Sequence, residues 1–345
     1  MSAPKPALVT IKDVARRAKL SIAAVSYALR DHPKIAAGTR ARVQSLAVAL
    51  GYRPNPRVAS LMSHIRRAQL RDAGEQIAFV WMHTTKAQAR ADPFLRKVFE
   101  GARQRAEQVG FALEEFWTSE RGMTERRLAQ IILARGIVGV VLSPVTTNEP
   151  AVTLDWDWRA FAAAVIGNVT WTPELHHAGH HHYFGMRMTL LELARLGCRR
   201  PVALIEPESN ERAKRAWEAA FLTHHPERGT AAEWVRVLGG ERPSADLVSW
   251  LRARRPDALI VSATRILQRP GLRAAARLLG IPVATLYWNG EEDGVGGVDQ
   301  CYDRIAAHAV DLVVTQLNNN EYGAPDLPRM MLFPGRWVPP RMPAG

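Results

Sequence analysis

The sequence has few cysteines and no long apolar run. Only Cys198 and Cys301 are cysteines among 345 residues, which is too few for a disulfide framework and lacks metal-site spacing. No stretch approaches the roughly 20 apolar residues of a membrane helix, and the first ten residues lack the apolar core of a signal peptide. We therefore expect a cytoplasmic protein without a membrane segment. With 23% charged and 47% hydrophobic residues, the chain suits about two globular domains.

Sequence signatures of catalysis are missing as well. The chain has no phosphate-cradling Gly-x-x-x-x-Gly-Lys-Ser, no nucleophile elbow and no His-Glu-x-x-His. The run Gly294-Val-Gly-Gly297 is too short for dinucleotide binding. We therefore predict a protein that is not an enzyme and needs neither a cofactor nor a metal.

Acidic residues are scarce at one end of the chain. Residues 1–71 hold 14 lysines and arginines against Asp13 and Asp31, a net charge of +12, whereas the remaining 274 residues carry only +1. A basic run is commonly just a solvated surface, but charge confined to one end favours a module that binds nucleic acid or a membrane surface.

The same segment has the pattern of three short helices. Thr10 and Asp13 are typical of a helix start, a short turn follows at Lys19, and Ser21 is placed to cap a second helix. A third helix is predicted from about 37 to 50. Two helices joined by a tight turn and closed by a third are typical of a helix-turn-helix, although such a mini-core also occurs in protein-contact modules.

The chemistry of that motif assigns roles to its side chains. A helix in the major groove presents its first turns to base edges, so Ile22, Ala23 and Tyr27 are the predicted base readers. Short hydroxyls hold phosphates, which nominates Ser21, Ser26 and Thr39. With apolar residues at 22 and 23, base readout is expected to use methyl contacts and one phenol.

The residues from Val9 to Leu61 are similar to the DNA-binding headpiece of the lactose and purine repressor (LacI/GalR) family of bacterial transcription regulators. The resemblance is carried by Val9-Thr-Ile-Lys-Asp-Val-Ala-Arg-Arg-Ala-Lys-Leu-Ser21, by Val25-Ser26, and by Leu50-Gly-Tyr-Arg-Pro-Asn55. It implies a homodimer that binds a pseudo-palindromic double-stranded DNA operator through a recognition helix from Ser21 to Arg30. Two departures are Tyr27, where Arg or His is common in the family, and Ala36, where a Ser usually caps the third helix.

A hinge is implied after the headpiece. Pro54-Asn-Pro56 ends the helical pattern, and the following segment resembles the family's hinge helix, in which Leu61 matches a leucine that wedges into the minor groove. A solvated linker is the alternative. The predicted DNA-contacting residues are Thr10, Ser21, Ile22, Ala23, Ser26, Tyr27, Arg30, Thr39, Asn55, Arg57, Val58 and Leu61.

From residue 76 onward, short β-branched runs alternate with amphipathic stretches. Strands are predicted at 77–82, 113–117, 138–143, 163–167, 202–206, 258–262 and 283–287, and a long helix at 301–317. Alternation of this kind favours parallel sheets covered by helices. This region resembles the periplasmic-binding-protein-like core of the same family, which implies two α/β lobes that close on a small ligand.

We therefore predict an all-α helix-turn-helix headpiece followed by an α/β periplasmic-binding-protein-like core of two parallel-sheet lobes. The predicted domains are a DNA-binding domain at 8–56, a hinge and linker at 57–75, and an effector-binding and dimerisation domain at 76–340. Within the last, the lobes are expected to split near 173 and to exchange strands near 298 and 320.

Ligands of open α/β sheets bind beyond the carboxyl ends of the strands. That rule nominates His83, Thr84, Ser143, Asn168, Trp288 and Asn289, and the family resemblance adds Arg212. A tryptophan platform with amide and guanidinium donors suits a sugar. His181 joins the predicted effector-binding residues because many relatives place an Asp near it.

Five histidines crowd into His176-His-Ala-Gly-His-His-His182. Adjacent histidines on a loop are able to offer nitrogen ligands to zinc or nickel. Metal sites usually draw ligands from separate segments, however, and the run contains no Cys or acidic residue. We therefore interpret it as a polar loop and predict no metal site.

Together these features predict a transcription regulator, a repressor, whose operator affinity is controlled by a sugar. The alternatives are an activator of the same class, a transport-type binding protein, and a sugar-processing enzyme with an appended DNA-binding domain. The missing export signal and the basic headpiece argue against the transport protein, and detectable turnover of a sugar would favour the enzyme.

Overall fold

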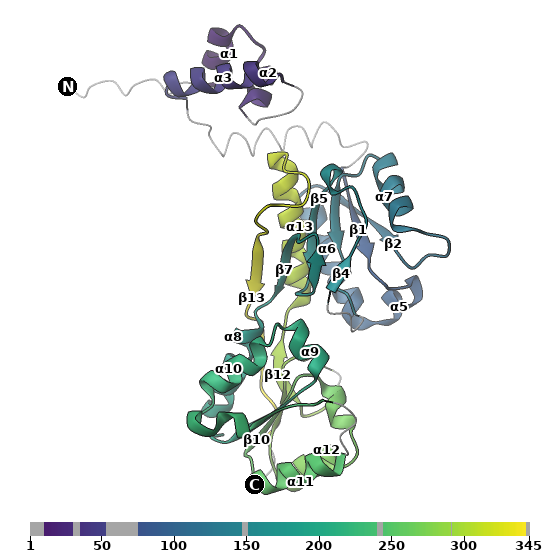
Figure 1. Ribbon diagram of the computed structural model, residues 1–345, viewed down its shortest axis with the longest axis vertical. Helices are drawn as coiled ribbons and strands as arrows, with labels where there is room; N and C mark the ends of the chain where they lie inside the picture. Colours follow the sequence, from purple (N-terminus) through teal and green to yellow (C-terminus); the bar gives the residue numbers. More distant parts are fainter. Residues whose placement is uncertain are drawn as a thin grey trace, which may run out of the picture. The chain divides into compact units, whose positions relative to one another are not determined.

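The computed structural model describes residues 10–29, 35–52, 75–146, 151–239, 244–290 and 292–342. The chain divides into two compact units, one comprising 1–75 with 315–322 and the other 76–314 with 323–345. Figure 1 traces both units along the sequence. The segment 53–74, which contains the predicted hinge helix, lies outside the described residues.

The headpiece consists of three helices, α1 (Ile11–Ala18), α2 (Ile22–Ala28) and α3 (Ala37–Ala49). α1 ends at Lys19, whose φ of 54° turns the chain toward α2. The apolar side chains that the helices share form a small core of Val14, Ala15, Ala18, Val25, Ala28, Val43 and Ala47. Burial of these residues is what stabilises so short a bundle, because isolated helices of this length are marginal in water.

The first lobe of the larger unit is built on a parallel sheet of six strands, in the order β13-β7-β5-β3-β1-β2. Its strands are β1 (Gln76–Trp81), β2 (Ala112–Trp117), β3 (Gly139–Leu142), β5 (Ala162–Ile166), β7 (His176–His180) and β13 (Met330–Phe333). Other elements are α5 (Lys86–Ala91), α6 (Pro93–Gln108), α7 (Glu125–Ala134), η1 (Trp158–Ala160), α13 (Tyr302–Asn319) and a small pair of strands, β4 (Ala151–Thr153) and β6 (Thr170–Thr172).

The second lobe contains a second six-stranded sheet, in the order β14-β12-β11-β10-β8-β9. Its strands are β8 (Pro201–Ile205), β9 (Val235–Val237), β10 (Ala258–Val261), β11 (Val283–Thr285), β12 (Gly296–Asp299) and β14 (Arg336–Val338). Its helices are α8 (His182–Arg195), α9 (Pro207–Arg212), α10 (Ala216–His224), η2 (Arg228–Glu233), α11 (Ser244–Arg254), η3 (Thr264–Gln268) and α12 (Leu272–Leu278). All strand pairs are parallel except β12 with β14, which is antiparallel at the sheet edge.

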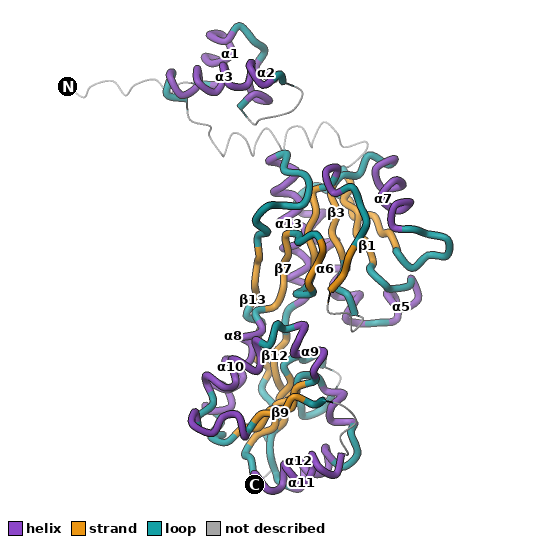
Figure 2. Tube along the Cα trace, viewed as in Figure 1, coloured by secondary structure: helices purple, strands orange, loops and turns teal. Residues whose placement is uncertain are grey.

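Both sheets are flanked by helices, as Figure 2 shows. β1, β3, β5, β8 and β10 are almost entirely buried, as expected for parallel strands covered on both faces. The α/β core of two parallel-sheet lobes that the sequence predicts is therefore present.

The chain passes between the lobes three times: after β7, between β12 and α13, and between β13 and β14. The predicted split near 173 is thus too early, because β7 stays in the first lobe, where it pairs with β5 and β13. The last crossing lies near 334, well after the predicted 320, because β13 still pairs in the first sheet. The crossing predicted near 298 coincides with the end of β12.

Candidate functional sites: the headpiece surface and the interlobe cavity

The second helix of the headpiece is fixed by its cap and by its buried face. Ser21 Oγ accepts a hydrogen bond from the Ala24 backbone N–H at 3.1 Å, while Val25 and Ala28 are fully buried against the neighbouring helices. Ile22, the first helical residue, is left 44% exposed on the outer side.

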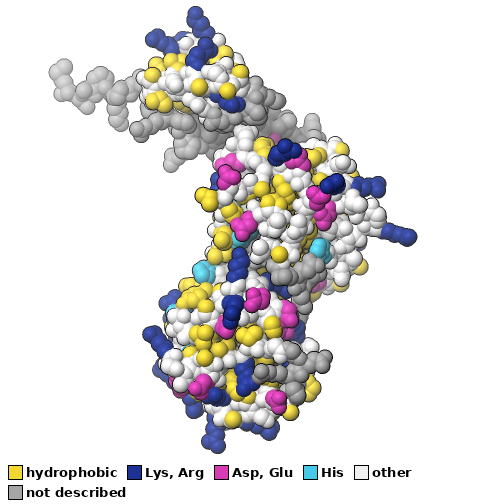
Figure 3. All heavy atoms as spheres, in the orientation of Figure 1, with side chains coloured by type: hydrophobic (Ala, Val, Ile, Leu, Met, Phe, Trp, Pro, Cys, Tyr) yellow, Lys and Arg dark blue, Asp and Glu magenta, His cyan; other side chains and the backbone are white. Residues whose placement is uncertain are grey.

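Exposed basic side chains lie on the two other helices of the headpiece and on the turn after α1. Lys12, Arg16, Arg17, Lys19 and Arg42 are all exposed, and basic side chains project from the headpiece in Figure 3. Within the described part of the headpiece the only acidic residue is Asp13, whose carboxylate accepts from the Thr10 hydroxyl at 2.7 Å and from Arg16 at 2.5 Å. These contacts, led by the Thr10 hydrogen bond, hold the pKa of Asp13 below its usual value. Asp13 is therefore a helix-capping carboxylate in a surface that is otherwise cationic.

The other predicted DNA-contacting residues differ in how much of them the structure describes. Thr10 is exposed, whereas Ser26, Tyr27 and Thr39 are half-buried. Nothing is described of the side chain of Ala23, and Arg30, Asn55, Arg57, Val58 and Leu61 lie outside the described residues.

A cavity of about 550 Å³ lies between the two lobes. It is lined by the segments that follow β3, β5, β10 and β11, by the starts of α6, α8, α10 and α13, and by α9. Its position beyond the carboxyl ends of the strands is the one where open α/β sheets bind ligands. Its volume is within the range of small-molecule sites in proteins.

The first-lobe wall is dominated by the start of α6. Asp92 caps that helix by accepting from the Phe94 N–H at 2.8 Å. The Phe94 ring lies edge-on to Tyr287 of the second lobe, at 5.7 Å between centroids, and to Tyr302, at 4.9 Å. One turn later, Lys97 Nζ lies 3.4 Å from the buried carboxylate of Asp299, at the end of β12. These two contacts join the lobes at the cavity.

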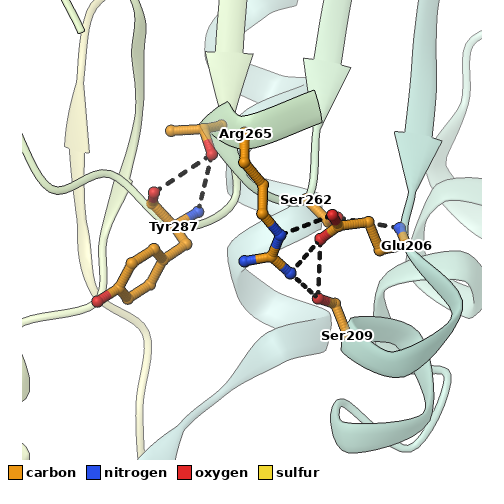
Figure 4. A network of polar contacts seen from close by, with 6 residues as sticks. Glu206, Ser209, Ser262, Arg265 and Tyr287 are labelled. Carbon is orange, nitrogen blue, oxygen red and sulfur yellow. Dashed lines mark hydrogen bonds and ion pairs between the residues drawn. The ribbon is translucent and has the colours of Figure 1, made fainter. Parts of the chain in front are cut away.

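The second-lobe wall contains a polar network, drawn in Figure 4. The Arg265 guanidinium donates to both oxygens of Glu206, at 2.7 and 2.5 Å. The Glu206 N–H donates to Ser262 Oγ at 3.1 Å, and Ser209 lies beside the ion pair. The network therefore connects the ends of β8 and β10 to the start of α9.

Four of the predicted effector-binding residues line the cavity, namely Asn168, Arg212, Trp288 and Asn289. Asn168 Oδ1 accepts from the His180 N–H at 3.0 Å, and the Trp288 indole N–H donates to the Val295 carbonyl at 3.1 Å. Burial shifts the pKa values of two other lining residues, lowering that of His182 and raising that of Tyr302 to about 12, and the charge of Arg212 acts to lower both.

The other four do not line the cavity. Ser143 is buried and its hydroxyl accepts from the Met82 N–H at 2.9 Å. The Thr84 hydroxyl donates to the Met82 carbonyl at 3.0 Å. His83 is exposed, and His181 Nδ1 caps α8 by accepting from the Phe184 N–H. The side chains of Ser143 and Thr84 thus bond at strand ends, and that of His181 bonds at a helix start.

The histidine run is a strand followed by a helix start, so the interpretation of a polar loop is wrong. β7 pairs with β5 and β13 in the middle of the run. His180 is 1% exposed, and both of its ring nitrogens lack a hydrogen-bond partner within the described structure. Its ring fits because Gly185 and Gly335 leave space for it: a Cβ on either would lie within 3.1 Å of the imidazole.

The run spreads its side chains over different surroundings. His176 Nδ1 accepts from the Arg329 N–H at 2.8 Å, whereas His182 packs edge-on against Trp217 at 4.8 Å and lines the cavity. Burial lowers the pKa of His182 to about 3, so this side chain is neutral at pH 7. Over the described ranges, no group of three or more His, Cys, Asp or Glu side chains is arranged to hold a metal ion.

Sequence reasoning missed several lining residues. Phe94 and Lys97 come from a helix start, and Gln300 and Tyr302 come from a crossing segment, so the strand-end rule does not select them. For Gln300 and Tyr302, the available signal was the polar and aromatic run Asp299-Gln-Cys-Tyr302 at the start of the predicted 301–317 helix.

Comparisons with known proteins agree with this architecture. Residues 10–55 match the family "Bacterial regulatory proteins, lacI family". Over 133 residues the chain is 27% identical to the HTH-type transcriptional repressor CytR of Escherichia coli K12, a match that spans 39% of this chain and 35% of that protein's length. The chain thus matches about a third of this curated relative.

Solved structures share the fold at low sequence identity. A LacI-family transcriptional regulator from Rhizobium etli aligns over 79% of this chain and 99% of its own, with a TM-score of 0.55 and 15% identity. The transcriptional regulator CelR in complex with cellobiose aligns over 97% of this chain and 99% of its own, with a TM-score of 0.53 and 16% identity. A periplasmic binding protein/LacI transcriptional regulator from Alkaliphilus metalliredigens QYMF, complexed with D-xylulofuranose, aligns over 79% of this chain and 100% of its own. The TM-score is 0.51 and the sequence identity 14%.

A basic helix-turn-helix headpiece joined to a two-lobed α/β unit defines the class of DNA-binding regulators with a periplasmic-binding-protein-like core. Residues 10–55 of this chain match the headpiece of the LacI family of bacterial regulatory proteins. Of the helices in the described ranges, none combines the length and apolar character needed to span a bilayer.

Proposed function

We propose that this chain is a sequence-specific transcriptional repressor, acting as a homodimer, whose affinity for its operator is controlled by a sugar bound between the lobes. The observation that carries the proposal is the presence, in one chain, of a cationic LacI-family headpiece and of a cavity that joins two lobes. A dimer places two headpieces on one duplex, so the operator is a pseudo-palindrome with each half read by one recognition helix.

The proposed control is thermodynamic linkage. A sugar that binds one arrangement of the lobes more tightly shifts the population toward it, and the operator affinity changes by the same coupling free energy. Leu61, outside the described residues, is the proposed minor-groove wedge of the hinge. Two regulators of the same fold, solved with cellobiose and with D-xylulofuranose, support a sugar as the effector.

We also infer that the sugar is bound without being converted. The carboxylates of Glu206 and Asp299 are engaged by arginine and lysine side chains, an arrangement that does not suit an acid–base pair for glycoside chemistry. Release of a new product from any sugar that binds, followed by chromatography, would contradict this inference.

The test is a selection of bound duplexes from a random pool by the purified full chain, followed by titration of the selected duplex with a panel of sugars. The proposal expects one palindromic consensus, and at least one sugar that changes the affinity for it. A pool without enrichment would refute operator recognition. Enrichment of a consensus that no sugar affects would refute only the control by a sugar.

A further inference from the structure

The charged side chains of the interlobe cavity balance one another. The cations that line it are Lys97, Arg212 and Arg265. The carboxylates in the lining are Asp92 and Asp299. Three further charged residues pair with lining residues: Glu206 with Arg265, Asp303 with Lys97, and the cation Arg336 with Asp299. Because the formal charges cancel, the cavity as a whole has no charge excess with which to attract an anion.

The pair of Glu206 and Arg265 is the most specific of these contacts (Figure 4). Arg265 Nε and Nη2 each donate to a different oxygen of the carboxylate, at 2.7 and 2.5 Å. The Glu206 side chain is only 15% exposed, and the backbone N–H of Glu206 is held by Ser262. Ser209 adds a longer contact to the carboxylate, at 3.3 Å. The position of Glu206 at the end of β8 therefore directs its carboxylate into the guanidinium fork.

A guanidinium fork of this geometry is how proteins recognise a carboxylate or a phosphate. In this protein Glu206 already occupies the fork. A ligand anion that took its place would leave a largely buried carboxylate without its partner, which is unfavourable. The first-lobe cation is also paired, because Lys97 Nζ lies 3.4 Å from Asp299 and 3.6 Å from Asp303.

The cavity instead offers neutral polar groups. Asn168 keeps its amide NH₂ after its oxygen has accepted from His180, and Gln300 keeps its carbonyl oxygen after its NH₂ has donated to Leu286 at 2.7 Å. Trp288 adds an aromatic ring to the same lining. Amide donors and acceptors beside an aromatic ring suit hydroxyl groups and the apolar face of a sugar ring.

We propose that Glu206 determines the class of effector: by occupying the fork of Arg265, it makes the cavity accept an uncharged saccharide and reject phosphorylated or acidic ones. The inference rests on the proposed function, since it concerns the effector of the proposed repressor. It assigns a specificity role to a residue that need not touch the sugar.

The test uses inorganic phosphate as the probe and the full-length protein, with binding followed by calorimetry. Glu206→Gln frees the fork, and we expect it to bind phosphate at least tenfold more tightly than the wild type does. The double variant Glu206→Gln/Arg265→Gln should lose that gain. The matched control is Glu218→Gln, because Glu218 is paired with Arg215 at 2.9 Å in the same lobe but does not line the cavity.

Equal phosphate affinity of Glu206→Gln and the wild type would overturn the proposal, as would an equal gain in Glu218→Gln. Should Glu206→Gln fail to fold, phosphate binding is compared between the wild type and Arg265→Gln. The proposal is overturned if the wild type binds phosphate and Arg265→Gln does not. It is supported if the wild type shows no phosphate binding that depends on Arg265. Operator selection by the wild type is measured separately, so a failed phosphate result leaves the proposed function standing.

Discussion

The buried His180 and the half-buried His182, at the first crossing between the lobes, make the stability of this protein depend on pH. Burial is the main cause that holds the pKa of His180 well below its usual value and lowers that of His182 to about 3. In the unfolded chain both titrate near 6.5. The unfolded state therefore takes up protons at a pH where the folded state does not.

We expect the contribution of these two histidines to the free energy of unfolding to be constant above pH 6.5. It should decrease as the pH falls from 6.5 toward 3. Each histidine contributes at most about 1.4 kcal/mol per pH unit. Urea unfolding at pH 7.5, 6.5 and 5.5 measures the slope, which His182→Gln should flatten, whereas substitution of the exposed His83 by Gln should leave it unchanged. An identical slope in His182→Gln and the wild type would contradict this account.

Gly101 allows α6 to approach the start of α13. A Cβ at this position would lie 2.2 Å from the carbonyl oxygen of Asp303, so Gly101→Ala must push the two helices apart. We expect a loss of about 1–3 kcal/mol in the free energy of unfolding, as for other overpacked sites. Gly229→Ala is the control, because nothing lies within 4 Å of its added Cβ. Equal effects of the two substitutions in urea unfolding would show that the close approach does not matter.

At the scale of elements, α3 lacks a side chain at its N-cap. Ala36 occupies that position with no side-chain hydrogen bond, whereas Ser21 caps α2. Ala36→Ser should stabilise α3 by about 1 kcal/mol. Amides of α3 that exchange through opening of the helix should then exchange roughly fivefold more slowly in the full chain. Ala49→Ser, at the other end of the helix, should give no such protection. Equal protection in the two variants would argue against a capping effect.

The exposed Ile22 at the start of α2 bears directly on base recognition. Apolar side chains in the major groove contact the methyl group of thymine. We therefore expect that one thymine in each half-site of the selected operator contacts Ile22. Replacement of that thymine by uracil should weaken binding of the wild type by about 1 kcal/mol, as for a lost base contact. The same replacement should have no effect on Ile22→Ala. Equal losses in both proteins, measured by fluorescence anisotropy, would exclude this contact.

The sequence predicts those strands whose own residues show the composition of a buried strand. β1, β3, β8 and β10 are mostly apolar runs that each contain two β-branched residues, and parallel strands covered on both faces have this composition. β7 has no such signal, because its histidines are buried through distant partners. The space for His180 depends on Gly335, 155 positions away in the sequence, and no local window contains that information.

The same distinction holds at the cavity. The strand-end rule selects Asn168 and Trp288, which line it, but also Ser143, whose hydroxyl instead accepts from a neighbouring strand. A residue's position after a strand follows from local sequence, whereas the direction of its side chain depends on which strands pair. For Lys97 the decisive partner is Asp299, in the other lobe.

At the scale of the whole molecule, charge and shape are divided between the two units. The net charge of +12 is confined to residues 1–71, and the cavity belongs to the unit that begins at 76. Binding to DNA should accordingly respond to salt through the headpiece, because its lysines and arginines displace counterions from phosphates. Binding of a neutral sugar in a charge-balanced cavity should respond little to salt.

Operator recognition by the headpiece is tested by a competition between the selected operator and an excess of genomic DNA for the full chain, across a series of salt concentrations. We expect a preference of at least about 10³-fold for the operator, and a logarithm of the affinity that falls steeply and linearly with the logarithm of the salt concentration. Equal affinity for operator and competitor at every salt concentration would refute operator recognition.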